Sequence, residues 1–260
     1  MIDIGVNLAD KRFAPDRDAV VDRALAAGVE AMILTGTHLA TSHAVAQLAA
    51  ARPGVLYATA GIHPHHARHF DATTPDALRA LAARPEVVAL GECGLDFDRD
   101  LSPRTTQIDA FETQLDLAAE LRLPVFLHER AAHAAFLTVL RAHRPALVGG
   151  VVHCFTGGPA EAEAYLALDL HLGVTGWICD DRRADPLRAA LPHIPLDRLL
   201  IETDAPYLTP RDRRPKPRNG RNEPALLPHI NRAVARYAGH DPQALAAATT
   251  ANARRLFDLK

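Results

Sequence analysis

The feature that most constrains the fold of this chain is a repeated alternation of short apolar runs with longer segments of helical period. Repeated β-then-α units build a parallel sheet, and eight of them in 260 residues predict a TIM (β/α)8 barrel, of class α/β, rather than a doubly wound open sheet. The expected strands are Ile2–Leu8, Ala31–Gly36, Val55–Gly61, Val87–Glu92, Val125–His128, Leu147–His153, Leu170–Gly176 and Leu199–Thr203. The expected helices include Arg17–Ala27, Thr105–Leu121, Ala131–His143, Pro159–Leu168 and a last one near Pro242–Phe257.

Length and composition favour one domain over residues 1–260, because single α/β barrels commonly reach this length. The three cysteines, Cys93, Cys154 and Cys179, lie far apart in apolar runs, as reduced thiols of a cytosolic protein do. The N-terminus lacks a basic signal region, and no apolar segment approaches the roughly 18 residues that a membrane helix needs. We therefore expect a soluble cytoplasmic protein without a membrane partner, acting as a monomer.

An acidic residue, Glu92, ends one of the expected buried strands. Burying a carboxylate is costly, and no lysine or arginine lies close in the sequence to neutralise it. Gly91 and Gly94 flank it, which suits a place where a ligand or another backbone comes near. Taken alone, such a carboxylate more often reaches solvent or a distant arginine.

Histidines and acids also follow four other expected strands. In a TIM barrel the chemistry gathers at the C-terminal ends of the strands, so these side chains should converge. Each histidine by itself is more often structural, but together they form the imidazole and carboxylate set that binds a divalent cation, which would supply the charge missing around Glu92. The strand-end residues are His63 and His65, His128, His153, and Glu202 with Asp204.

Several spaced motifs resemble the TatD-type metal-dependent deoxyribonucleases, a TIM-barrel branch of the amidohydrolase superfamily, over nearly the full length. The resemblance implies a metallo-dependent hydrolase whose metal ligands are Glu92, His128, His153 and Asp204, with His63 and His65 at the same site. It implies 3′-5′ exonuclease activity on single-stranded DNA and RNA, a role in DNA repair, and Mg²⁺ as cofactor. The motifs include Asp3–Leu8, Ala60–His65, Gly91–Phe97, Pro124–His128, His153–Gly157, Thr175–Cys179, Glu202–Leu208 and Arg221–Pro224.

This chain departs from the wider family at the end of the first strand, where Gly5 and Asn7 stand in place of a His-x-His pair. Glycine offers no ligand, and an Asn amide is a weak ligand beside imidazole. The site is therefore expected to hold either a single tightly bound ion, or that ion and a second one that binds only together with substrate phosphate. The imidazole ligands would also suit Mn²⁺ or Zn²⁺. Glu129 follows His128 directly and should point away from the site.

The chemistry that these residues allow is metal-assisted hydrolysis of a phosphodiester by an attacking water. Asp204 is the expected base and Glu92 the second catalytic carboxylate, because both should lie beside the metal. The alternative role of Asp204 is a helix or loop cap in the run Thr203–Pro206.

The net charge of −2 argues against a surface that is positively charged all over, as general nucleic-acid binding would need. Any affinity for phosphate must therefore come from a local group of basic residues. The loop Arg211–Arg221 supplies it, with one acid, Asp212, among its basic residues, although such runs are often merely solvated. We expect Trp177 and Tyr207 to stack bases and Asn222 to assist, while packing at the barrel mouth is the alternative for each aromatic residue and for Phe155. The basic residues are Arg211, Arg213, Arg214, Lys216, Arg218 and Arg221.

Two other classes of function fit the same sequence. One is a related metal-dependent hydrolase of an ester or amide outside nucleic acids, because this fold supports many reactions. The other is a metal-depleted nucleic-acid-binding protein. The basic loop argues against the first, and the intact strand-end ligands argue against the second.

Overall fold

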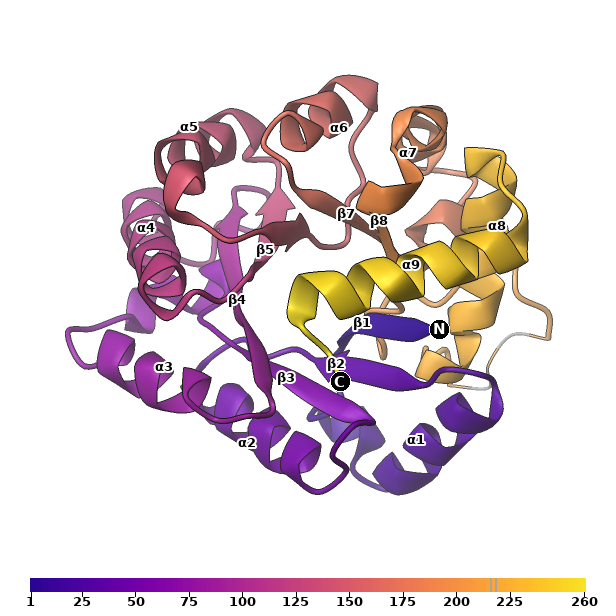
Figure 1. The fold of residues 1–260 in the computed structure, drawn as a ribbon, viewed down its shortest axis with the longest axis horizontal. Coiled ribbons are helices and arrows are strands. Elements are labelled where there is room, and N and C mark those ends of the chain that lie inside the picture. The colour runs from indigo at the N-terminus through magenta and orange to yellow at the C-terminus, as the bar shows by residue number, and fades with distance from the viewer. Residues whose placement is uncertain (216, 218) are drawn as a thin grey trace.

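Eight parallel strands, paired in the order in which they follow in the chain, form the centre of the fold (Figure 1). The computed structural model describes residues 1–215, 217 and 219–260. The ring closes where Val6 bridges Ala205 beyond the last strand, and Asn7 donates a backbone hydrogen bond of 2.7 Å to Ala205. The predicted (β/α)8 barrel is thereby confirmed. The strands are β1 Ile2–Val6, β2 Ala31–Leu34, β3 Leu56–Ala60, β4 Val87–Asp96, β5 Val125–Arg130, β6 Gly150–Val152, β7 His171–Val174 and β8 Leu199–Ile201.

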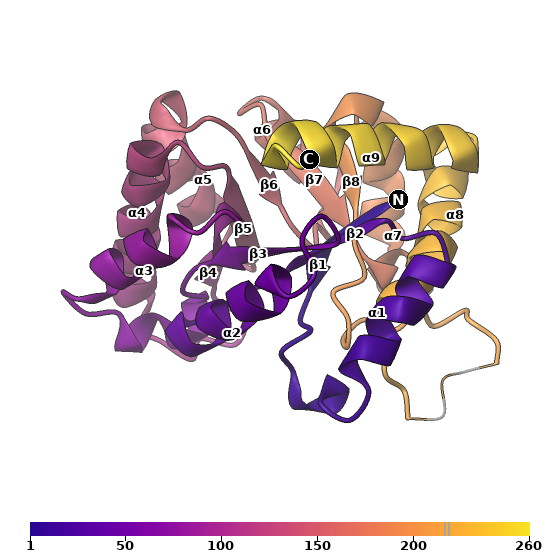
Figure 2. The same ribbon diagram turned by 60° about the horizontal axis from the view of Figure 1, so that its bottom comes forward.

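Helices surround the strands, as the alternation predicted (Figures 1 and 2). Asp241 caps the last helix, its side chain accepting hydrogen bonds from the backbone of Gln243 and Ala244, and Pro242 follows as the first helical residue. This local signal explains why that helix begins where the sequence predicted. The α-helices are α1 Arg17–Ala26, α2 Leu39–Ala50, α3 Thr74–Ala82, α4 Arg104–Leu121, α5 His133–His143, α6 Pro159–Leu166, α7 Asp185–Ala190, α8 Leu227–Ala238 and α9 Pro242–Phe257.

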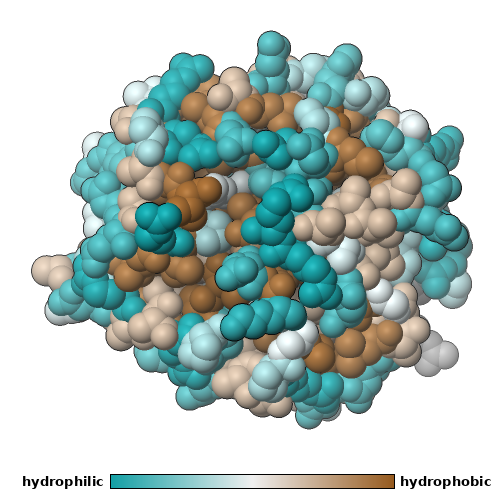
Figure 3. Space-filling view, viewed as in Figure 1, coloured by the Kyte–Doolittle hydropathy of each residue, from teal (hydrophilic) through white to brown (hydrophobic). Residues whose placement is uncertain are grey.

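Helix α9 lies across the end of the barrel at which the strands begin (Figure 1). Phe257 and Leu259, at and after its C-terminal end, join the buried cluster inside the barrel, which includes Ile4 and Phe126. On this face hydrophilic side chains are interspersed with hydrophobic ones (Figure 3). The connections after β1 and β8 leave the C-terminal ends of these strands. They therefore extend from the end of the barrel opposite to α9 (Figure 2).

The expected strand ends differ from the observed ones in a way that bears on the site. Strand β4 does not end at Glu92 but continues to Asp96, because its parallel pairing with β5 goes on through Gly94 beside His128 and Asp96 beside Arg130. Strands β6 and β8 end earlier than expected, at Val152 and Ile201. The polar residues predicted at these two strand ends, His153 after β6 and Glu202 and Asp204 after β8, therefore lie in the connections that follow the strands.

The two glycines beside Glu92 are required by close backbone approach, as predicted. Gly91 has φ 135° and Gly94 has φ 143°, values that side-chain-bearing residues rarely adopt. A Cβ atom at Gly91 would overlap the carbonyl of Phe126, and one at Gly94 would overlap the carbonyl of His128. The neighbouring strand β5 can therefore lie directly against this part of β4.

Among the described residues, no helix combines the length and the apolar composition that crossing a membrane would demand.

Candidate metal centre

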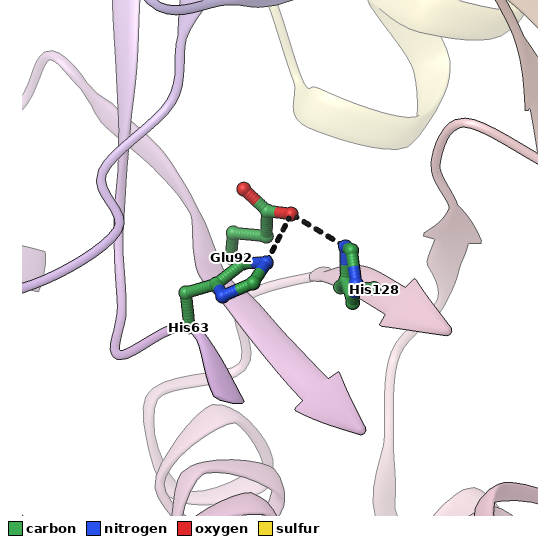
Figure 4. Close-up of side chains that lie close together, drawn as sticks. All are labelled: His63, Glu92 and His128. Atoms are coloured by element: carbon green, nitrogen blue, oxygen red, sulfur yellow. Dashed lines mark hydrogen bonds and ion pairs between the residues drawn. The ribbon is translucent and has the colours of Figure 1, made fainter. Parts of the chain in front are cut away.

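Three histidines converge on one oxygen of Glu92 at the C-terminal end of the barrel. Oε1 of Glu92 lies 2.8 Å from Nε2 of His153, 2.9 Å from Nδ1 of His128 and 3.3 Å from Nε2 of His63. Figure 4 shows His63 and His128 directed at this carboxylate from two sides. The side chains come from β4, β5 and the segments that follow β3 and β6, so the predicted convergence of strand ends is observed for these four residues.

Electrostatics hold Glu92 in its charged form. Burial alone would raise the pKa of Glu92, but the charge of His153, with hydrogen bonds from His128 and His153, lowers it well below its ordinary value. Without a bound cation, the positive charge next to Glu92 comes from His153.

The pKa of His153 is shifted in the opposite direction, upward. Burial would lower its pKa, but Glu92 and Glu202 raise it well above the usual value, since Nδ1 of His153 also lies 3.3 Å from Oε2 of Glu202. Burial lowers the pKa of His63 to about 4, so that ring is neutral at physiological pH. A neutral imidazole is the form that ligates a metal.

Asp96 is part of the site, although it was not among the site residues predicted from the sequence. Its buried carboxylate lies 2.7 Å from Nε2 of His65 and 3.4 Å from Nε2 of His128. His65 is thereby held beside His63, with their ring centroids 4.3 Å apart. The signal that could have found Asp96 is its place four residues after Glu92, on the same face of an extended strand.

The donor set fits a divalent cation. His63, Glu92 and His128 each offer one ligand atom, and these atoms lie within 4.8 Å of one another. Nε2 of His128 is buried without a hydrogen-bond partner in the part of the chain that the structure describes, an arrangement that a bound ion or substrate would satisfy. Nitrogen and carboxylate oxygen together suit Zn²⁺ and Mn²⁺ as well as Mg²⁺.

Asp204 lies on the loop just after β8, with φ 53°, and its Oδ1 accepts a hydrogen bond of 2.8 Å from Nδ2 of Asn7. Burial, helped by the charges of Glu92 and Glu202 and opposed by that of His153, raises the pKa of Asp204 to about 7. The direct contact that the structure gives Asp204 is with Asn7, so metal ligation by Asp204 stays a prediction.

The glycine at the end of the first strand makes room for a carboxylate. A Cβ atom at Gly5 would overlap Oε2 of Glu202, which is fully buried. Oε1 of Glu202 accepts a hydrogen bond of 2.5 Å from the backbone of Cys154. Glu202 and Asn7 therefore occupy the place where a His-x-His pair would stand, the first orienting His153 and the second orienting Asp204.

Glu129 points away from the centre, as the alternation of a strand requires. It accepts hydrogen bonds from the backbone of Ala132 at 2.7 Å and from the hydroxyl of Tyr165 at 3.1 Å. The expectation that it has no catalytic role is consistent with this position.

The predicted substrate-binding residues divide into two groups. Trp177, Tyr207, Arg211, Arg213 and Arg214 lie on connections at the C-terminal end of the barrel, and their guanidinium or aromatic groups reach the surface. In this group Arg214 donates to the carbonyl of Arg211 at 2.8 Å. Lys216 and Arg218 lie outside the described residues.

Two others, Arg221 and Asn222, are held inside the structure, which argues against direct contact with substrate. Arg221 pairs with Asp16 at 2.8 Å and with Glu223 at 2.6 Å, leaving its side chain 11% exposed. Asn222 is fully buried and donates hydrogen bonds to the carbonyls of Thr203 and Tyr207. These contacts hold the loop that carries the other arginines, and substrate binding by Arg221 and Asn222 stays a prediction.

The family model of the TatD related DNases matches residues 2–258. The chain is 55% identical over 259 residues to the 3'-5' ssDNA/RNA exonuclease TatD of Erwinia billingiae (strain Eb661), covering 100% of this chain and 99% of the relative. A relative of the same description from Salmonella typhimurium (strain LT2) is 52% identical, again over 100% of this chain and 99% of the relative. Among solved structures, the TatD homolog YJJV from Escherichia coli k12 is similar with a TM-score of 0.90 and 29% identity, covering 100% of this chain and 98% of the other.

Proposed function

We propose, from the premise that this chain belongs to the TatD related DNase family, that it is a metal-dependent 3′-5′ exonuclease of single-stranded DNA and RNA. The observation that carries the proposal is the convergence of His63, His128 and His153 on Glu92, in a chain that matches exonuclease relatives from end to end. The family model spans nearly the whole chain, which supports one hydrolase domain over residues 1–260. We further propose that the enzyme acts as a monomer in the cytoplasm and that it takes part in DNA repair.

Glu92, His128, His153 and His63 would hold the cation. His65 and Asp204 would lie at the edge of the metal site. A divalent cation held there would supply Lewis acidity to the phosphodiester and lower the pKa of a water. We propose Mg²⁺ as that ion from the family membership, in one or two copies, although the imidazole donors also suit Mn²⁺ or Zn²⁺. Metal analysis of the purified protein tests this choice.

The chain's own residues then provide the acid–base chemistry. The carboxylate of Asp204, whose pKa burial raises to about 7, is matched to accepting a proton from the attacking water near neutral pH. Asn7 fixes the orientation of that carboxylate through its hydrogen bond of 2.8 Å. Asp96 fixes His65, and Glu202 fixes His153, so that both rings keep one orientation toward the site.

Arg211, Arg213 and Arg214, on the loop after β8, would neutralise the phosphates of the strand near the reacting one. Local positive charge of this kind lets a chain of net charge −2 hold a polyanion.

Incubation with a 5′-labelled single strand tests the proposal. We expect a ladder of products shortened stepwise from the 3′ end, abolished by EDTA and restored by added Mg²⁺ or Mn²⁺. Hydrolysis of acyl esters or amides with intact oligonucleotides would instead favour the related non-nucleic-acid hydrolase, and tight binding of the strand without products would favour the metal-depleted binding protein.

A further inference from the structure

A pocket of about 380 Å³ lies between two connections at the C-terminal end of the barrel. One wall is the turn Gly176–Cys179 that follows β7, with Trp177, and the other is the segment from Leu208 to Pro210 that follows β8. The volume is in the range that holds a nucleotide-sized ligand. The proposed acid–base chemistry does not use this pocket, and of its lining residues only Arg211 has a proposed role in phosphate binding.

A single buried carboxylate organises the charge around it. Asp180 is only 4% exposed, yet it binds Arg182 at 2.9 Å, Arg183 at 3.0 Å and Arg211 at 3.1 Å. The three arginine side chains remain 60%, 44% and 57% exposed respectively. Three guanidinium groups on one carboxylate leave a net positive charge with hydrogen-bond donors free to face solvent.

The neighbouring acids bind partners other than these three arginines. Asp181 binds Arg188 at 2.7 Å, and Asp212 binds His229 at 2.8 Å. The second pair also anchors the loop after β8 to helix α8. Within the loop, the hydroxyl of Thr209 donates a hydrogen bond of 2.7 Å to the carbonyl of Gly220. The walls of the pocket are therefore fixed before any ligand arrives.

Trp177 is fixed in the same way. The guanidinium of Arg183 lies 3.9 Å from the centroid of its ring, and the indole Nε1 donates to the carbonyl of Arg183 at 3.3 Å. An indole ring next to exposed guanidinium groups is the combination that binds a base and its phosphate together.

The pocket is continuous with the reaction centre along the backbone. Leu208 follows Asp204 by four residues, and a Cβ atom at Gly176 would overlap the carbonyl of Leu208, so the two walls touch there. Thr175, next to Gly176, lies 3.7 Å from the sulfur of Cys154, the residue after His153. These contacts connect the walls of the pocket to the loops that carry His153 and Asp204.

We infer that this pocket binds a nucleotide flanking the scissile phosphodiester, with its phosphate on Arg183 and Arg211 and its base against Trp177. The inference rests on the proposed exonuclease function and names a subsite for it. Asp180 is a positioning residue, because it acts only through the arginines that it holds.

Kinetics provide the first test. In Arg183→Ala, we expect KM for a single-stranded oligonucleotide to rise about tenfold, kcat to stay within about twofold, and the slope of log(kcat/KM) against log salt to become shallower by about one. Arg79→Ala is the matched control, because Arg79 is 40% exposed and bound to Asp76 and Glu120 on helices α3 and α4. An unchanged KM in both Arg183→Ala and Arg211→Ala would overturn the inference.

Trp177 provides the second test, because it is the only tryptophan of the chain. In EDTA, titration with a thymidine oligonucleotide should change its emission saturably, with a dissociation constant about tenfold weaker in Arg183→Ala and unchanged in Arg79→Ala. Fluorescence anisotropy of the same oligonucleotide, labelled, reports binding anywhere on the protein. Binding seen by anisotropy with no change in Trp177 emission would overturn the inference.

The two tests separate this inference from the proposed function. A wild-type protein that degrades the oligonucleotide but shows neither effect retains the function and loses the subsite. A wild-type protein that degrades no oligonucleotide with any added metal loses the function, whatever the emission of Trp177 does.

Discussion

Nε2 of His153 lies 2.8 Å from Oε1 of Glu92, although 61 residues separate the two in the chain. Glu92→Gln keeps the shape of the side chain but removes the charge on which the imidazoles converge. We expect kcat/KM on single strands to fall at least about 100-fold, because the metal loses its carboxylate ligand. His153→Ala should have a similar effect.

The matched control for these two variants is Glu120→Gln, which removes an exposed carboxylate that pairs with Arg79 on the outer helices. Its activity should equal that of wild type. Circular dichroism should show native folds in all of these variants, and full activity in either Glu92→Gln or His153→Ala would remove the proposed centre.

The stability of the protein should depend on pH through Asp3. Burial raises the pKa of Asp3 to about 8 from 3.8, against the hydrogen bonds from Thr203 and Gly5 that favour its charged form. Because the folded-state pKa is the higher one, the stability that the protonated group contributes is complete below about pH 4. It is lost as the pH rises toward 8.

Urea unfolding in EDTA at several pH values measures this effect. The free energy of unfolding of Asp3→Asn minus that of wild type should grow between pH 4 and 8 by more than about 1.4 kcal/mol, the equivalent of one pKa unit. A difference that stays flat over this range would show that Asp3 is ionised in the folded protein.

Metal affinity should rise with pH because a proton on Asp204 competes with the cation. Burial raises the pKa of Asp204 to about 7, so the group is largely protonated at pH 6 and ionised at pH 8 in the metal-free protein. Calorimetric titration with Mn²⁺ should show an association constant that increases up to about tenfold per pH unit below pH 7. Asp204→Asn should lose that part of the dependence and lower kcat, and a variant that keeps both would return Asp204 to a structural role.

The arginines of the loop after β8 should contribute to substrate binding rather than to catalysis. Changing Arg213 and Arg214 together to Ala should raise KM for oligonucleotides and flatten its salt dependence, because each phosphate contact releases counterions. The kcat value should be retained. Arg221→Ala should differ, since this residue pairs with Asp16 and Glu223, and lower thermal stability is expected instead. If KM and its salt dependence stay unchanged in the double variant, the loop is only a solvated surface.

The sequence carried most of the fold because its signal is local. Alternating apolar runs and helical segments predicted eight strands in a barrel, and local capping at Asp241 placed the start of α9. The rule that parallel strands gather their C-terminal residues then predicted that Glu92, His63, His128 and His153 meet.

Strand boundaries and side-chain partners required the tertiary structure. Asp96 belongs to the site only because β4 pairs with β5 four residues further than its apolar run suggested. Its partner His65 lies 31 residues away, and no local pattern encodes that distance.

The sequence by itself determined the barrel and the residue types that gather at its open end, because periodicity and strand order are properties of neighbouring residues. Only the tertiary structure decided which atoms meet: that Glu202 fills the space left by Gly5, that Asn7 orients Asp204, and that Asp180 holds three arginines beside Trp177. These contacts depend on closing the ring and on the register between strands, which join segments far apart in the chain.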